Sequence, residues 1–206
     1  MIRVVALFSA ATVMLGIAAG YYFVLSRDGA DPFADCRRTQ IAGGQAAIGG
    51  PFSLIDTEDR RVTDEDVIAG PTLIYFGYAF CPDFCPMDLA RNAAAADALA
   101  ARGVDVAQVF ITVDPERDTP QVLADYTAWI HPALVGLTGT PEETAAAANA
   151  YRVYSRRGAG EDEFYLVDHS TFTYLVAPGE GFLEFYSTTA SPDEVAESVA
   201  CYAARL

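Results

Sequence analysis

Two cysteines four positions apart are the residues of this chain best suited to chemistry. Cys81 and Cys85 stand in the run Tyr78-Ala-Phe-Cys-Pro-Asp-Phe-Cys-Pro86, between an apolar segment and an alanine-rich one. Thiolates bind soft metal ions, above all Cu(I), and they also exchange disulfides. The spacing Cys-x3-Cys is longer than the Cys-x2-Cys of common redox domains, and it lets both sulfurs face one small ion. A structural disulfide or a pair of packed thiols is the alternative interpretation.

The local sequence predicts which thiol ionises more readily. Pro86 suits the first turn of a helix, which would make Cys85 the N-cap residue. Unpaired backbone N–H groups and the positive end of the helix dipole would then lower the pKa of its thiol. We therefore expect Cys85 to be the thiolate-prone member of the pair.

A tight metal site needs a third ligand, and the chain has two histidines. His169 lies in a predicted loop just before a predicted strand at residues 172–177. In the sheet predicted below, this loop lies beside the cysteines, so His169 is the candidate ligand. Asp168 or a nearby carbonyl would orient its imidazole. His131 follows a predicted helix, where a structural interaction with the helix C-terminus is favoured.

The surrounding elements alternate between strands and helices. Apolar runs predict buried strands at 71–77 and 104–113, and a short strand at 52–55. Helices are predicted at 86–101, 119–129 and 141–150, and a final one opens at the capping box Ser191-Pro-Asp-Glu194. A hairpin is predicted over 172–186. This order predicts an α/β, thioredoxin-like fold with an extra N-terminal β-hairpin and an inserted helix.

The N-terminus predicts a membrane segment. Residues 4–26 carry no charge, and 23 residues of helix extend about 34 Å, enough to cross a hydrocarbon core. We predict an anchor at 1–27, a linker at 28–44 and a domain at 45–206. The positive charge at the N-terminus favours a single-pass inner-membrane protein whose domain faces the periplasm. A cleaved signal peptide is the alternative. The net charge of −15 argues against nucleic acid as a partner.

At this point the chain resembles the Sco/SenC family of membrane-anchored copper proteins. The matching segments are Gly49-Gly-Pro-Phe52, Phe80-Cys-Pro-Asp-Phe-Cys-Pro86, Val113-Asp-Pro-Glu-Arg-Asp-Thr-Pro120 and Asp168-His-Ser170. They run in family order over residues 45–203. Phe84 replaces a more usual smaller aliphatic residue, a change that we expect to be tolerated. The resemblance implies a thioredoxin fold and a copper site made by Cys81, Cys85 and His169.

The resemblance also implies a role in assembling the binuclear copper centre of cytochrome c oxidase. The hypothesis is a copper chaperone that holds Cu(I), and Cu(II) with an added oxygen ligand. Its partners would be the copper-receiving oxidase subunit and other periplasmic copper chaperones. A thiol–disulfide oxidoreductase that reduces the cysteines of that copper site, with Cys81 and Cys85 as its redox pair, is the enzymatic alternative. A copper or redox sensor is a third.

The remaining predictions concern acidic residues and the other two cysteines. Carboxylates expected near the site would form either a rim that attracts cations or a solvated acidic face: Asp83, Asp88, Asp114, Glu116, Asp118 and Asp168. Asp114, with Asp168, is also a candidate for supporting the metal ligands. Cys36 and Cys201 are predicted to pair in an oxidising compartment, although free thiols or a bridge between two chains are alternatives.

Overall fold

The computed structural model describes residues 14–22, 31–39, 41, 44–158, 160 and 164–206. The chain divides into two compact units, Met1–Asp35 and Cys36–Leu206. In the first unit, residues 14–22 are helical. Among the described residues no helix is long and apolar enough to cross a membrane. Most of the predicted anchor at 1–27 lies outside the described residues, so the anchor stays a prediction.

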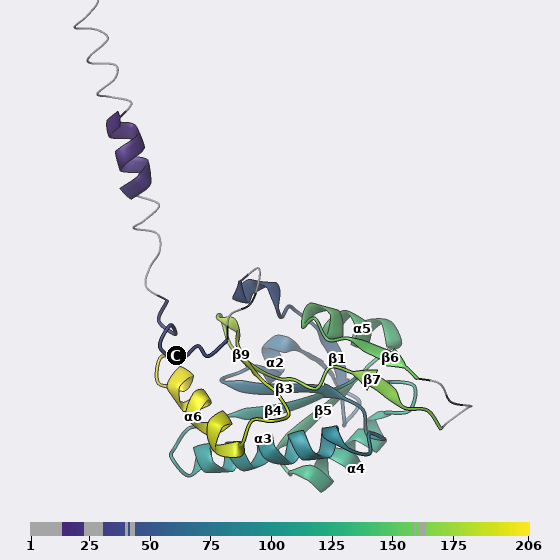
Figure 1. Cartoon of the computed structure of the whole chain (residues 1–206). Helices are drawn as coiled ribbons and strands as arrows, with labels where there is room; N and C mark the ends of the chain where they lie inside the picture. The colour runs from purple at the N-terminus through teal and green to yellow at the C-terminus, as the bar shows by residue number, and fades with distance from the viewer. Residues whose placement is uncertain (1–13, 23–30, 40, 42–43, 159, 161–163) are drawn as a thin grey trace, which may run out of the picture. The chain divides into compact units, whose positions relative to one another are not determined.

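The second unit is built on one seven-stranded sheet with the order β2-β1-β5-β4-β3-β8-β9 (Figure 1). Its strands are β1 (Ser53–Asp56), β2 (Arg61–Thr63), β3 (Thr72–Gly77), β4 (Ala107–Thr112), β5 (Leu134–Thr138), β8 (Thr173–Ala177) and β9 (Gly181–Tyr186). Strands β3, β4 and β5 are parallel, whereas β8 runs antiparallel to β3. The predicted mixed α/β, thioredoxin-like architecture is confirmed, with β1 and β2 as the extra N-terminal hairpin.

Helices cover both faces of this sheet. They are α2 (Asp64–Val67), α3 (Phe84–Ala100), α4 (Pro120–Ile130), α5 (Pro141–Ala150) and α6 (Pro192–Ala203), with a short 3-10 turn, η1, at Gln45–Ala47. Figure 1 shows α3, α4 and α6 on one side of the sheet and α5 on the other. The capping box predicted for α6 is present, and α5 begins with one as well.

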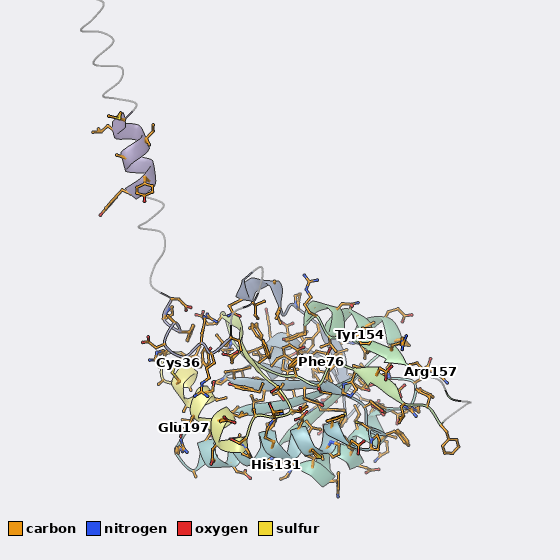
Figure 2. The ribbon with its side chains drawn as sticks, in the orientation of Figure 1. Cys36, Phe76, His131, Tyr154, Arg157 and Glu197 are labelled. Atoms are coloured by element: carbon orange, nitrogen blue, oxygen red, sulfur yellow. A yellow bond between two sulfur atoms is a disulfide. The ribbon has the colours of Figure 1, made fainter. Side chains whose placement is uncertain are left out.

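The alternation of side chains along β3 divides the core between these two faces. Ile74 and Phe76 join the cluster that packs against α5 (Phe76 is labelled in Figure 2). Tyr75 joins the opposite cluster, which also contains Cys85 and Leu89 of α3. Every residue of β3 is buried, as its continuous apolar run predicts. The strand therefore ends inside the protein at Gly77, and Cys81 and Cys85 come shortly after it in the sequence.

Two features of the fold were not predicted. Strand β5 lies between α4 and α5, and its short run is interrupted by Gly136. A Cβ at that position would lie 3.0 Å from Thr127 Cγ2 of α4, so the close helix packing requires glycine there. The second feature is a separate two-stranded sheet of β6 (Ser155–Arg157) and β7 (Val167–His169). His169 ends a strand, and the prediction that it lies in a loop was wrong.

A disulfide joins Cys36 to Cys201. Cys201 lies in α6, and Figure 2 labels Cys36 beside that helix. The same lead-in segment is held to β9 by Glu184, whose buried carboxylate accepts hydrogen bonds from Arg38 N at 2.9 Å and from the Thr39 hydroxyl. The pairing predicted from the cysteine count is the one that the structure contains.

Candidate metal centre

Strand β3 and helix α3 bring the two cysteines together through the short loop at residues 78–83, which we call the dithiol loop. Cys81 is half-buried in this loop, whereas Cys85 is 0% exposed. Helix α3 begins at Phe84, with Asp83 as its N-cap residue. The prediction that Cys85 is the N-cap was therefore wrong by two positions. Pro86 is the third helical residue, where its missing N–H still leaves no helical hydrogen bond unmade.

Gly77, the last residue of β3, makes room for the Cys85 sulfur. A Cβ at this position would lie 2.7 Å from Cys85 Sγ, 3.0 Å from Tyr75 Cε1 and 3.1 Å from Phe110 Cε2. Real Cβ atoms do not approach sulfur so closely, because atomic contacts are optimal near 3.5–4.0 Å. The strand and the helix can therefore meet at this separation only because residue 77 has no side chain.

The strand β7 presents His169 to the same place. Its Nε2 lies 3.4 Å from Cys85 Sγ, and its Nδ1 lies 2.8 Å from the carbonyl oxygen of Ser170. Since a carbonyl can only accept, Nδ1 carries a proton, and Nε2 is the ring nitrogen that faces the Cys85 sulfur. Tyr78 contacts the imidazole edge to face, with ring centroids 5.7 Å apart. The imidazole is thus oriented as a ligand before any metal binds.

Cys81 Sγ, Cys85 Sγ and a ring nitrogen of His169 all lie within 4.8 Å of one another. Two thiolates and one imidazole suit soft or borderline ions such as Cu(I) and Zn²⁺, and they do not suit Mg²⁺ or Ca²⁺. The structure thus brings together the three residues that the sequence proposed as metal ligands. It does not bring His131 there, because that residue caps α4 and its Nε2 lies 3.3 Å from Asp97.

The two thiols have opposite electrostatic environments. The Cys85 thiol, followed by His169 and the backbone N–H groups of Cys85 and Asp83, stabilises the Cys81 thiolate and lowers its pKa to about 3, although burial opposes this. The pKa of Cys85 is raised by the same hydrogen bond to Cys81 and by its own burial. The expectation that Cys85 is the thiolate-prone cysteine was therefore wrong. The helix N–H groups face the sulfur of Cys81 because α3 starts earlier than predicted.

The two carboxylates proposed to support the ligands have other partners. Asp168 is exposed and pairs with Arg156 at 3.4 Å, and the Ser170 carbonyl orients His169 in its place. Asp114 is buried, where it accepts hydrogen bonds from Arg117 at 2.5 Å and from the Tyr165 hydroxyl at 2.7 Å. Asp88 and Asp118 are buried as well. Three of the six carboxylates proposed as a rim are therefore interior groups.

The segment that follows β4 contacts the dithiol loop through Asp118 and Arg117. The sequence interpretation did not predict this role. Asp118 accepts hydrogen bonds from Ala79 N at 3.0 Å and from Thr112 Oγ1 at 2.6 Å. Arg117 stacks over the Phe80 ring at 4.9 Å and over the Tyr165 ring at 3.6 Å. The sequence could have indicated this contact. The dithiol loop follows β3 and the second segment follows β4, and the carboxyl ends of neighbouring parallel strands lie side by side.

Phe84, which the family resemblance suggests is larger than the expected residue, is 50% exposed. Its larger side chain therefore extends from the first helical position of α3 toward solvent and displaces nothing in the core. This exposure agrees with the expectation that the change is tolerated.

A thioredoxin-like domain whose dithiol loop meets a histidine from a neighbouring strand is a metal-binding variant of that fold, and the comparisons agree. The sequence profile described as SCO1/SenC matches residues 41–204. The chain therefore belongs to the SCO1/SenC family. It is 50% identical over 194 residues to "Protein SenC" of Rhodobacter capsulatus, covering 94% of this chain and 86% of that one.

Solved structures give the same result. The Arabidopsis thaliana ScoI structure with copper bound is 46% identical, covers 76% of this chain and 98% of that one, and superimposes with a TM-score of 0.72. The Bradyrhizobium japonicum ScoI structure with copper bound is 38% identical. It covers 76% of this chain and 99% of that one, with a TM-score of 0.69. Against "Protein SCO1 homolog 1, mitochondrial" of Arabidopsis thaliana the identity is 47%, over 77% of this chain and 48% of that one. The chain thus spans about half the length of this mitochondrial relative.

Proposed function

We propose that this chain is a membrane-anchored, extracytoplasmic copper chaperone that assists assembly of the binuclear copper centre of cytochrome c oxidase. The observation that carries the proposal is the convergence of Cys81, Cys85 and His169 within 4.8 Å. The homologous structures named above contain copper. Two thiolates and one imidazole suit copper, the cargo, because soft sulfur ligands favour Cu(I).

Transfer of the cargo follows from the unequal exposure of its ligands. Cys81 is half-buried and Cys85 is buried, so a cysteine of the receiving protein would approach Cu(I) from the side of Cys81. Three ligands leave the ion open to a fourth, which permits exchange without prior release into solution. Cu(II) would bind with an added oxygen ligand.

The test is a Cu(I) competition titration of residues 36–206, the second compact unit, against its His169→Ala variant. The wild-type domain should bind one Cu(I), and loss of the imidazole should weaken binding at least tenfold, about 1.4 kcal/mol. His131→Ala is the matched control, because that imidazole caps α4 far from the cysteines in sequence. Unchanged Cu(I) affinity in the His169 variant would refute the three-ligand site.

A thiol–disulfide oxidoreductase is the second candidate, favoured by the lowered pKa of the half-exposed Cys81 beside a buried partner thiol. This chemistry does not need His169 as a ligand. Reduction of a disulfide-containing peptide by the His169→Ala variant at the wild-type rate, together with unchanged copper affinity, would favour the reductase.

A further inference from the structure

His169 lies on a hairpin that buries few of its own residues. Strands β6 and β7 have three residues each and form a sheet of their own. All of β6 is exposed, and in β7 only Val167 is fully buried. A two-stranded hairpin alone is at best marginally stable in water. Contacts from outside the two strands are therefore needed to keep His169 beside the cysteines.

Tyr165, two residues before β7, fastens this hairpin to the rest of the domain. Its side chain is buried in the same cluster as Cys85. Its hydroxyl donates a hydrogen bond of 2.7 Å to Asp114 Oδ1, and its carbonyl oxygen accepts one of 3.0 Å from Arg117 Nη1. The Arg117 guanidinium also lies 3.6 Å from the centre of the Tyr165 ring. Arg157, labelled in Figure 2, covers the same ring at 3.7 Å, but it belongs to the hairpin itself.

Arg117 contacts the dithiol loop with the same guanidinium. Its Cζ lies 4.9 Å from the centre of the Phe80 ring and 5.7 Å from that of the Tyr78 ring. The buried carboxylate of Asp114 holds the group in place through a hydrogen bond of 2.5 Å from Nε. A planar guanidinium can donate several directed hydrogen bonds and stack on aromatic faces at the same time. Arg117 therefore connects the loop that carries Cys81 with the segment that leads to the histidine.

We propose that the contact between Arg117 and Tyr165 holds β7 against the dithiol loop and thereby positions His169 before a metal binds. Arg117 is a positioning residue, because it acts on the imidazole through Tyr165. A ligand that is already held in place need not be ordered when the ion binds, which favours binding. The proposal gives a role to the segment Val113-Asp-Pro-Glu-Arg-Asp-Thr-Pro120. Its consequence for copper rests on the proposed function, whereas the contact itself belongs to the metal-free protein.

The first test is hydrogen exchange in the metal-free, full-length protein, followed by mass spectrometry. Arg117→Lys keeps a positive charge beside Asp114 but loses the planar group that stacks on Tyr165. We expect the amide hydrogens of β6 and β7 to exchange about tenfold faster in this variant, while those of β4 keep their wild-type rates. Exchange in a central strand reports opening of the whole domain, so this combination separates release of the hairpin from general destabilisation.

Tyr165→Leu removes the other side of the contact. It leaves the pair of Arg117 and Asp114 intact and keeps an apolar side chain in the cluster. Exchange in β6 and β7 should rise as in Arg117→Lys, and the double variant should exchange no faster than either single variant, because both changes break one contact. Arg156→Lys is the matched control, since Arg156 is exposed and pairs with Asp168 within the hairpin. It should leave the exchange rates unchanged.

The second test asks whether the contact acts through the histidine. Arg117→Lys should weaken Cu(I) binding about fivefold in a competition titration. In the His169→Ala background the same change should alter the affinity by less than about twofold, because the imidazole that the contact positions is absent.

Two results would overturn the inference. One is wild-type exchange in β6 and β7 in both Arg117→Lys and Tyr165→Leu, which would mean that other contacts hold the hairpin. The other is an equal loss of Cu(I) affinity with and without His169, which would mean that Arg117 acts on the dithiol loop instead. If the wild-type protein binds no copper, the proposed function fails, but the exchange experiment still decides whether the contact holds the hairpin.

Discussion

Gly77 gives the sharpest prediction of the site's architecture. In Gly77→Ala the new methyl group would lie 2.7 Å from Cys85 Sγ, about 1 Å inside an optimal contact. The sulfur must withdraw by about that distance, or the strand must move away from α3. A metal site tolerates displacements of about 0.5 Å, so we expect Cu(I) affinity to fall at least tenfold, or about 1.4 kcal/mol. Overpacking should also destabilise the fold by about 1–3 kcal/mol.

The measurement is a Cu(I) competition titration of Gly77→Ala, accompanied by urea unfolding of the metal-free protein. Gly70→Ala is the control, because a Cβ there would meet no atom within 4 Å and no unusual backbone angle restricts the position. Wild-type copper affinity in Gly77→Ala would refute the reasoning. It would mean that the Cys85 sulfur can bind the metal from another rotamer.

Three further predictions concern stability. Burial raises the pKa of Asp118 from 3.8 to about 6. Because the folded state binds this proton more tightly than the unfolded state, stability falls as the pH rises from about 4 to about 6, and the loss is complete above pH 6. Wild type should therefore gain about 2–3 kcal/mol relative to Asp118→Asn between pH 7 and pH 4 in urea unfolding. Arg91→Ala should lose about 3–5 kcal/mol, because it leaves the buried Asp88 carboxylate unpaired. Replacing both Cys36 and Cys201 by serine should cost roughly 2–4 kcal/mol and leave Cu(I) affinity unchanged.

Each of these has a control or a contradicting outcome. A pH-independent difference between wild type and Asp118→Asn would show that Asp118 titrates normally. Arg102→Ala removes an exposed pair with Glu197 and should cost only about 0.2–1 kcal/mol; equal losses in both arginine variants would contradict the buried network. For the disulfide, non-reducing peptide mapping that finds both cysteines alkylated would contradict the bridge.

The ligand residues could be proposed from the sequence because their types and spacing have few other uses. The electrostatic environment of each thiol could not be predicted from the sequence, because it depends on the residue at which α3 begins. A shift of two residues moves the helix N–H groups from the Cys85 sulfur to that of Cys81. Propensity rules place a proline in the first turn but do not say at which of its positions.

The missed strands have a similar physical explanation. Strand β5 is short and contains a glycine that α4 packing requires. Strand β6 is the exposed run Ser155-Arg-Arg157, which shows neither an apolar pattern nor alternation. Both strands form because tertiary neighbours complete their hydrogen bonding, and this information is not local. Buried Asp114 and Asp118 were misjudged for the same reason, since their partners come from distant segments.

The separate β6–β7 sheet gives a metal ion at this site a mechanical role. Cys81 and Cys85 follow β3, a strand of the seven-stranded sheet, whereas His169 is the last residue of β7 in the two-stranded sheet. An ion bound by all three would join the two sheets as a reversible cross-link. Amide hydrogens of β6 and β7 should then exchange more slowly in the loaded protein.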